Sequence, residues 1–293
     1  MHLRSGPPSR VTAAALTLAA AFAGAPPAAA DIGPGAVVFT PHRAIYDLSL
    51  SRAATGSGVA DVNGRIVYEI TGSACEGYTQ NMRFVSRTSN QEGNAQETDL
   101  RTSSWEDVPA RKLRFSTSSY QNGALAEQTR GTASRAEPGQ AGKAELAKPE
   151  ARTIEIPAGV YFPIQHSMAL IVAAREGRHV LSADLYDGSD NGTKLFATSA
   201  IVGRQAVAGA VKFPAKLAGT AALAESPSWP VSISYFEYGA RRKDEIPLYE
   251  MSYRFHENGV TSALVIDYGD YAVKGDLAAL ELLEPSKCAP ARQ

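Results

Sequence analysis

Alternation between apolar and polar side chains dominates this chain. A period of two places successive side chains on opposite faces of a β-strand, so that one face is buried and the other is wet. The pattern is clearest at residues 229–235 and 249–255, where every second residue is apolar. The same alternation occurs at residues 46–50, 66–70, 82–84 and 113–115. The sequence therefore predicts a mainly β protein.

Asn-Gly or Asp-Gly pairs punctuate the alternating segments. This kind of dipeptide is the strongest short-range signal for a β-hairpin. The pairs are Asn63-Gly64, Asn122-Gly123, Asp187-Gly188, Asn191-Gly192 and Asn258-Gly259. Strand, turn and strand repeated in this way predict an antiparallel meander. Such a sheet has to curl or close to protect its edges.

One segment has a helical period instead. Ile164, Met168 and Ile171 recur at spacings of three and four residues, and Pro163 suits the first turn of a helix. We predict one substantial helix at residues 163–176. We expect it to plug or line the curled sheet.

Three further stretches have weaker patterns. Residues 275–284 fit either a helix or a strand, and we favour a strand because it returns Cys288 to the body of the protein. Residues 133–149 and 214–230 mix Ala, Gly, Pro and charged residues, which predicts loose, exposed structure. The sequence assigns no role to the predicted loops at 133–149 and 206–225.

The N-terminal segment has the features of a cleaved secretory signal peptide. Two arginines precede an apolar run at residues 11–23, and small residues follow at 28–30. A membrane anchor is the alternative, but the apolar run is shorter than the ~20 residues that a bilayer needs. We predict a signal peptide at residues 1–30 and a single exported domain at residues 31–293.

Charge limits the classes of partner. The whole chain has 29 basic and 30 acidic residues, a net charge of −1. Residues 1–30 contain two of the arginines and no acid, so the rest of the chain carries 27 − 30 = −3. This mildly acidic balance argues against binding to nucleic acid. No later segment has the length and apolarity of a membrane span, so we expect a protein that does not span the membrane.

The chain has two cysteines, Cys75 and Cys288. In an exported protein such a pair favours a disulfide. The alternative, a reactive thiol at Cys75, would need a nearby histidine or another setting that lowers its pKa. The sequence has no Cys-x-x-Cys motif and no histidine close to either cysteine. We favour the disulfide.

The histidines lack the spacing of a catalytic or metal site. Neither His-Glu-x-x-His nor His-x-His occurs among His42, His166, His179 and His256. His166 and Ser167 are adjacent on the predicted helix, and adjacent helical residues do not face each other. Motifs of serine hydrolases are also absent. We therefore predict structural histidines, no enzyme activity, no metal and no cofactor.

A polar segment resembles part of a calcium-binding loop. Asp187, Ser189, Asn191 and Gly192 occupy its first, third, fifth and sixth positions. The twelfth position should be a bidentate glutamate, but it is Thr198. A tight polar hairpin is the simpler interpretation, and we favour it over calcium binding.

Aromatic residues in the predicted strands allow two interpretations. They could fill the core of a curled sheet, or they could line a cavity for an apolar ligand such as an acyl chain. Core filling is the commoner outcome, and we favour it. Alternation alone does not distinguish a filled barrel from a hollow one.

Three segments carry a family resemblance. Residues 39–50, 64–84 and 185–196 read FTPHRAIYDLSL, GRIVYEITGSACEGYTQNMRF and LYDGSDNGTKLF. They resemble the envelope-integrity protein B (EipB) family, and the similarity extends over residues 39–288. The resemblance implies a periplasmic protein with one disulfide, here Cys75 to Cys288. It also implies a broken β-spiral, in which antiparallel strands wind into an open barrel with a helix, similar to lipoprotein-carrier folds of the periplasm.

The resemblance further implies a role in maintaining the cell envelope under stress, without an established enzymatic activity. We expect a non-enzymatic periplasmic protein that binds a partner protein, a lipid or a glycan of the envelope. The alternative is a periplasmic carrier that holds a lipid or another hydrophobic ligand in the open barrel.

The disulfide leads to a test. Replacing Cys288→Ser is expected to lower the melting temperature by many degrees, because a cross-link over so long a loop stabilises by roughly 5 kcal/mol at most. Thermal melts followed by circular dichroism would measure the change, and Cys75→Ser should lose the same amount. A Cys288→Ser protein that melts like its parent would show that the cross-link does not exist.

Overall fold

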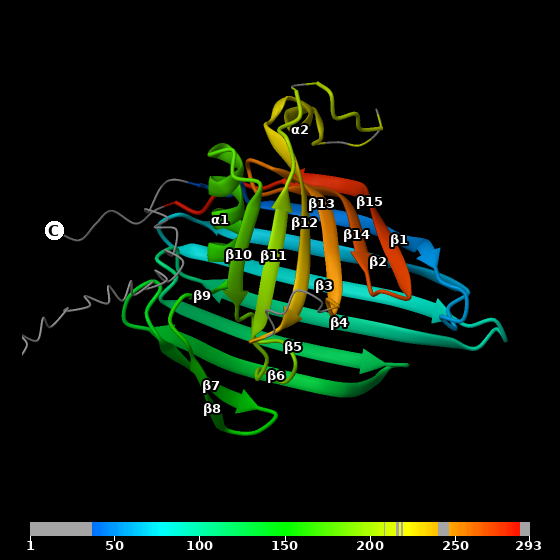
Figure 1. Cartoon of the computed structure of the whole chain (residues 1–293), viewed down its shortest axis with the longest axis horizontal. Coiled ribbons are helices and arrows are strands. Elements are labelled where there is room, and N and C mark those ends of the chain that lie inside the picture. The colour runs from blue at the N-terminus through cyan, green and yellow to red at the C-terminus, as the bar shows by residue number, and fades with distance from the viewer. Residues whose placement is uncertain (1–36, 208, 215–216, 218, 240–245, 288–293) are drawn as a thin grey trace, which may run out of the picture.

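The strands of the described chain join edge to edge into one 15-stranded sheet that winds into an open barrel (Figure 1). The computed structural model describes residues 37–207, 209–214, 217, 219–239 and 246–287. The predicted signal peptide at residues 1–30 lies outside these ranges. The strands are β1 (His42–Ala53), β2 (Asp61–Ser73), β3 (Gly77–Ser89), β4 (Ala95–Glu106), β5 (Lys112–Gln121), β6 (Ala124–Arg135), β7 (Gly142–Lys148), β8 (Arg152–Ile156), β9 (Val160–Tyr161), β10 (Val180–Leu185), β11 (Phe196–Val202), β12 (Ser228–Glu237), β13 (Tyr249–His256), β14 (Thr261–Asp267) and β15 (Tyr271–Leu282). The helices are α1 (Pro163–Arg175) and α2 (Ala221–Glu225).

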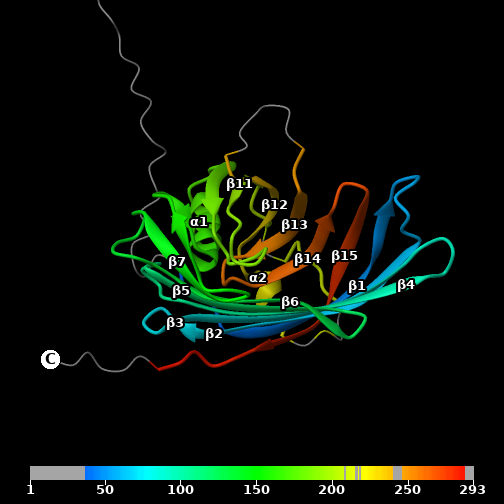
Figure 2. The same ribbon diagram turned by 90° about the horizontal axis from the view of Figure 1, so that it is seen from below.

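The order of the strands explains the winding. The sheet runs from β8 back through β7 to β1, continues through β15 to β10, and ends at β9. Its two ends, β8 and β9, are consecutive in the chain, so the chain itself passes from one end of the sheet to the other. Figure 1 shows β10–β13 crossing in front of β3–β6 at a steep angle, with α1 beside β10. In Figure 2 the two groups of strands form separate walls.

The predicted fold class is confirmed: a mainly β, antiparallel open barrel with one substantial helix. The helix predicted at residues 163–176 is α1, which ends at Arg175. The strand favoured for residues 275–284 is the second half of β15. Pairing throughout the sheet is antiparallel except between β9 and β10.

The turn signals were right at most of their positions. Asn122-Gly123 connects β5 to β6 and Asn258-Gly259 connects β13 to β14, and both glycines have positive φ angles. The two pairs at residues 187–192 lie in the connection between β10 and β11, which pair with each other. The prediction for Asn63-Gly64 was wrong, because this pair lies inside β2. A Cβ atom on Gly64 would lie 2.1 Å from the Val85 carbonyl oxygen, so the glycine permits a close approach of neighbouring strands.

The prediction of an exposed loop at residues 133–149 was wrong. The stretch contains the end of β6 and all of β7, and Ala133 pairs with Ala144. Both alanines are fully buried, and Leu146 is almost completely buried. Small buried residues alternate with charged ones here. Because alanine is only weakly apolar, the difference in hydrophobicity between the two faces of the strand is small, and the alternation is hard to recognise in the sequence. The prediction of loose, exposed structure at residues 214–230 was wrong in part, because residues 221–225 form α2 and residues 228–230 begin β12, where Trp229 is buried. The stretch at 206–225 likewise ends in α2.

The beginning of α1 is held by side chains at the ends of β4 and β6. The Glu106 carboxylate, at the end of β4, accepts hydrogen bonds from the backbone N–H groups of Ile164 (2.7 Å) and Gln165 (2.9 Å). These are donors that a helix leaves without an internal partner. Arg135 donates to the carbonyl oxygen of Val160 (2.6 Å) and lies over the Phe162 ring. Buried polar contacts therefore join β4 and β6 to the helix.

The connection between β10 and β11 packs against the opposite part of the sheet. The ring of Tyr186 lies edge-on to Phe115 of β5, with centroids 5.8 Å apart. A Cβ atom on Gly188 would lie 2.3 Å from the Phe115 ring, which leaves room for glycine alone. Residues of β5–β9 and this connection form a common buried cluster. Together with α1, the connection closes this side of the barrel.

Part of the predicted disulfide can be located. Cys75 lies in the turn between β2 and β3, and its sulfur is 3.1 Å from the Ser73 hydroxyl. Ser286 comes back to the same place, where its hydroxyl donates to that of Ser73 (3.2 Å). Cys288 lies outside the described residues, so the pairing stays a prediction. The position of Ser286, two residues earlier, supports it.

Gly188 provides a test of the closure. Replacing Gly188→Ala is expected to destabilise the protein by about 2–4 kcal/mol, since positive-φ strain adds to a clash with Phe115. Gly123→Ala is the matched control, because Gly123 also has a positive φ but has open space around it. It should cost about 1 kcal/mol, from strain alone. Equal losses in chemical denaturation would contradict the packing of this connection.

Glu106 predicts a dependence of stability on pH. Burial raises the pKa of Glu106 from 4.5 to about 8, although the two N–H donors and Arg135 act in the opposite direction. The folded state thus keeps a proton that the unfolded chain releases above 4.5, so stability falls as the pH rises towards 8. Between pH 6.5 and 8 the loss should be about 2 kcal/mol, since one pKa unit corresponds to about 1.4 kcal/mol. Denaturant unfolding over this range would measure the slope.

Glu106→Gln should flatten this slope, whatever its effect on absolute stability. Glu137→Gln, which changes an exposed carboxylate, should leave the slope unchanged. Burial lowers the pKa of both His166 and His256 to about 4 and also lowers the pKa of His42, whereas the unfolded chain still releases histidine protons around 6.5. These histidines therefore make stability rise slightly with pH in this window, opposite in sign to Glu106, and they do so equally in the parent and in Glu106→Gln. An unchanged slope in Glu106→Gln would exclude Glu106 as its source.

Candidate functional site

An apolar cavity of about 500 Å³ lies between the two walls of the barrel. This volume is within the range of roughly 300–1,000 Å³ that is typical of ligand pockets. One wall comes from β1–β4 and the other from β12–β14, with one residue contributed by α1. The lining residues are Phe39, Tyr46, Ile66, Tyr68, Ile70, Met82, Phe84, Leu100, Ser167, Tyr235, Tyr249, Met251, Tyr253, Phe255, Gly259, Thr261, Leu264, Ile266 and Tyr268.

Strand register explains why these side chains meet. Ile66 pairs with Phe84, and Phe84 with Leu100, so three neighbouring strands present apolar groups at the same level. On the other wall Tyr235 pairs with Tyr249. Side chains at paired positions share a face of the sheet. The inward faces of alternating strands therefore become the lining of the cavity.

The aromatic residues divide between the two roles that the sequence left open. Trp229 and Tyr78 are buried in the cluster around α1 and fill the core. Met82, Phe84 and Tyr253 are only partly buried and line the cavity. Core filling, which we favoured from the sequence, therefore describes only part of the barrel.

The two walls differ in chemistry. Aliphatic and other non-hydroxylic side chains predominate on β2–β4, whereas β12 and β13 supply Tyr235, Tyr249 and Tyr253. Tyr235 and Tyr249 stack with ring centroids 4.4 Å apart and planes at 14°. Burial raises the pKa of Tyr253 well above its ordinary value, so this phenol is neutral at physiological pH.

One side of the cavity opens near the turn between β14 and β15. Tyr268 lines the cavity, yet 40% of its surface is exposed. Its ring stacks on Tyr271 with centroids 5.0 Å apart. Figure 2 shows the hairpin of β14 and β15 at the rim of the barrel. A ligand in the cavity could therefore keep one end in water beside Tyr268.

Sequence reasoning missed several lining residues. Leu100 lies between Asp99 and Arg101, so it has no apolar neighbour two positions away to reveal a strand face. On β14, Leu264 and Ile266 face the cavity, but Val265 between them removes the polar contrast. The pairing of both strands with recognisable neighbours is the signal that could have located them.

Each of the four histidines makes a structural hydrogen bond. His166 Nε2 donates to the Thr198 hydroxyl (3.2 Å), which itself donates to the carbonyl oxygen of Ala183 (2.7 Å). Ser167, by contrast, lines the cavity. The other contacts are His42 Nδ1 to Thr40 O (2.8 Å), His179 Nδ1 to Val202 O (2.9 Å) and His256 Nε2 to the Ser262 hydroxyl (3.0 Å). In the described ranges no three His, Cys, Asp or Glu side chains form a group suited to a metal ion.

The positions that resemble a calcium loop do not converge. Asp187 accepts a hydrogen bond from the Ser189 N–H (2.9 Å), as in a tight polar turn. The Asn191 N–H points instead to Glu127 of β6 (3.0 Å). Thr198, at the twelfth position, lies within β11 and donates to a β10 carbonyl. This geometry favours the polar connection over calcium binding.

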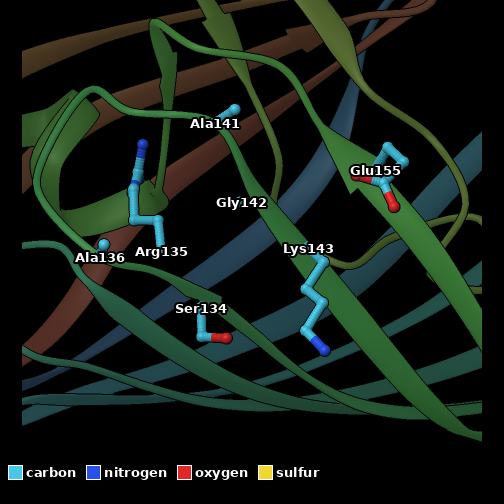
Figure 3. A pocket seen from close by; sticks show the side chains of 7 residues that line it. All are labelled: Ser134, Arg135, Ala136, Ala141, Gly142, Lys143 and Glu155. Carbon is cyan, nitrogen blue, oxygen red and sulfur yellow. The ribbon is translucent and has the colours of Figure 1, made fainter.

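A second hollow, of about 420 Å³, lies over the ends of β6–β8 (Figure 3). Its lining residues are Ser134, Arg135, Ala136, Ala141, Gly142, Lys143 and Glu155. Figure 3 shows Arg135 and Lys143 pointing in different directions. Arg135 takes the buried contacts near α1 described above, and Lys143 pairs with Glu145 at 2.7 Å. Since both cations already have partners, this hollow is a weaker candidate than the apolar cavity.

Comparisons with known proteins agree with the resemblance seen in the sequence. The cell envelope integrity protein EipB of Brucella abortus (strain 2308) is 36% identical over 268 residues, which cover 92% of this chain and 91% of that protein. A crystal structure of a beta-barrel-like protein of domain of unknown function DUF1849 from Brucella abortus matches with a TM-score of 0.75 and 34% identity. The match covers 85% of this chain and all of the other.

No helix among the described residues is long and apolar enough to cross a membrane. The model of the EipB-like family matches residues 34–284, a range that contains the whole sheet and both helices. With the fold, the relative and the family match in agreement, this chain belongs to the EipB-like family.

Proposed function

We propose that this protein is a non-catalytic periplasmic component that supports cell-envelope integrity by binding a hydrophobic chain in its cavity. The cavity between β1–β4 and β12–β14 carries the proposal. Family membership and the relative named for cell envelope integrity support the envelope role. The signal-peptide features of residues 1–30 support export.

The chemistry of the lining favours binding over catalysis. The cavity is lined by apolar and aromatic side chains, with hydroxyls from tyrosine, serine and threonine as its polar side chains. A general acid or base has to reach the reacting group with a suitable pKa. His166 is turned towards Thr198, and the lining contains no histidine, carboxylate or amine among the described residues.

An acyl chain fits this environment energetically. Burial of each methylene contributes about 0.8 kcal/mol, so a dozen buried methylenes contribute about 10 kcal/mol before the cost of association is subtracted. Polar ligands would have to give up hydration for few hydrogen bonds. The alternative of a periplasmic carrier is therefore better supported than a protein-binding scaffold.

An interaction scaffold would require a contiguous exposed apolar patch. The most exposed large apolar side chains in the described ranges are Ile246 and Val207, and they lie on different segments. Val180 and Ile201 are paired neighbours on β10 and β11, but two residues make a small patch. This surface does not favour a protein partner over the cavity.

Filling the cavity tests the proposal. Leu100→Trp places an indole in the lumen and is expected to weaken binding of the uncharged fluorescent probe N-phenyl-1-naphthylamine by about tenfold or more, as overpacking removes the space. Leu125→Trp is the matched control, because Leu125 is exposed outside the cavity. Fluorescence titration would measure both. If the probe fails to bind the parent, or binds the two variants equally, the cavity is not the binding site.

A further inference from the structure

The tyrosines of the cavity differ in whether the protein satisfies their hydroxyl groups. Tyr46 donates to the carbonyl oxygen of Thr261 (2.8 Å), and Tyr68 accepts from Gln80 (2.8 Å). Among the described residues the hydroxyls of Tyr235, Tyr249 and Tyr253 have no hydrogen-bond partner, and none of the three is a fully enclosed polar atom, while all three residues line the cavity. A buried phenol usually finds a partner. These three hydroxyls, on β12 and β13, are therefore available to a ligand.

The same wall is unfavourable to an anion. No described lining residue carries a positive charge. A carboxylate taken into such a site would lose hydration without gaining a counter-ion, which costs several kcal/mol.

We infer that the cavity selects an acyl chain whose carbonyl group is uncharged, as in an ester or an amide, over the anion of a free fatty acid. This inference rests on the proposed function and names its ligand class. The hydrocarbon lies against the wall of β2–β4, and the carbonyl oxygen accepts hydrogen bonds from tyrosine hydroxyls of β12 and β13. The polar remainder of the ligand reaches water beside Tyr268, where the cavity opens.

Two features of the tyrosine wall make it suitable for carbonyl recognition. Stacking of Tyr235 on Tyr249, with Phe196 edge-on to both rings, fixes the positions of the hydroxyls before a ligand arrives. Such preorganisation reduces the entropy lost on binding. The phenols also stay neutral at physiological pH, so they donate without introducing charge.

The test compares two ligands with the same chain length at neutral pH. Monomyristoylglycerol carries an uncharged ester, and myristate carries a carboxylate. Each would compete with N-phenyl-1-naphthylamine for the parent protein, below its own critical micelle concentration. We expect the ester to compete at least about tenfold better than the anion, since an unpaired buried charge is penalised and the carbonyl is satisfied.

The hydroxyls are tested by removing them. Tyr249→Phe and Tyr253→Phe together should weaken competition by monomyristoylglycerol by about fivefold for each hydroxyl that donates to it. Direct binding of the naphthylamine probe, which lacks a carbonyl group, should change little. Tyr120→Phe is the control, because Tyr120 packs beneath Arg101 and is not among the lining residues.

The outcomes separate the two proposals. If the probe does not bind, or binds Leu100→Trp as well as the parent, the hydrophobic cavity site itself fails. If the probe binds in the cavity but myristate competes as well as the ester, the selectivity inferred here is wrong. Equal competition by the ester in the parent and in the double phenylalanine variant would likewise overturn the role of the tyrosines.

Discussion

The architecture depends on one constraint: a long antiparallel sheet must turn a single face inwards, and its side chains do not fill the space that this face encloses. Period-two alternation fixes which side chains face in. At one end α1 and the connection between β10 and β11 occupy the interior and form dense core with β5–β9. Away from α1 and this connection, the walls formed by β1–β4 and β12–β14 remain apart, and the cavity is the space between them.

Buried acidic and basic side chains support the closure of the barrel, and none of them is among the described lining residues of the cavity. Glu106 and Arg135 hold the first turn of α1 against the ends of β4 and β6. His166 joins the same helix to β11 through Thr198. These groups keep their charges or polar atoms satisfied by specific partners, which is the condition for tolerating them in a core. The lumen itself can then remain uncharged.

The sequence predicted the fold class because the strongest patterns are local. Alternation at Tyr249–Phe255 and the turns at Gly123 and Gly259 depend on neighbouring residues. Failures occurred where a residue serves a distant contact. Gly64 is a glycine because Val85 of the adjacent strand comes close, and Ala144 is buried because it faces Ala133. The hollow could not be predicted, since it depends on how far apart two walls lie and not on the pattern within either.

Chemical asymmetry between the walls gives the cavity its specificity. A lumen lined only by aliphatic groups would distinguish ligands by length and little else, because the hydrophobic effect has no direction. Hydroxyls concentrated on β12 and β13 add direction, and the lack of a cation among the described lining residues adds a penalty against anions. Attraction for a carbonyl and exclusion of a carboxylate act together, and specificity commonly needs both elements.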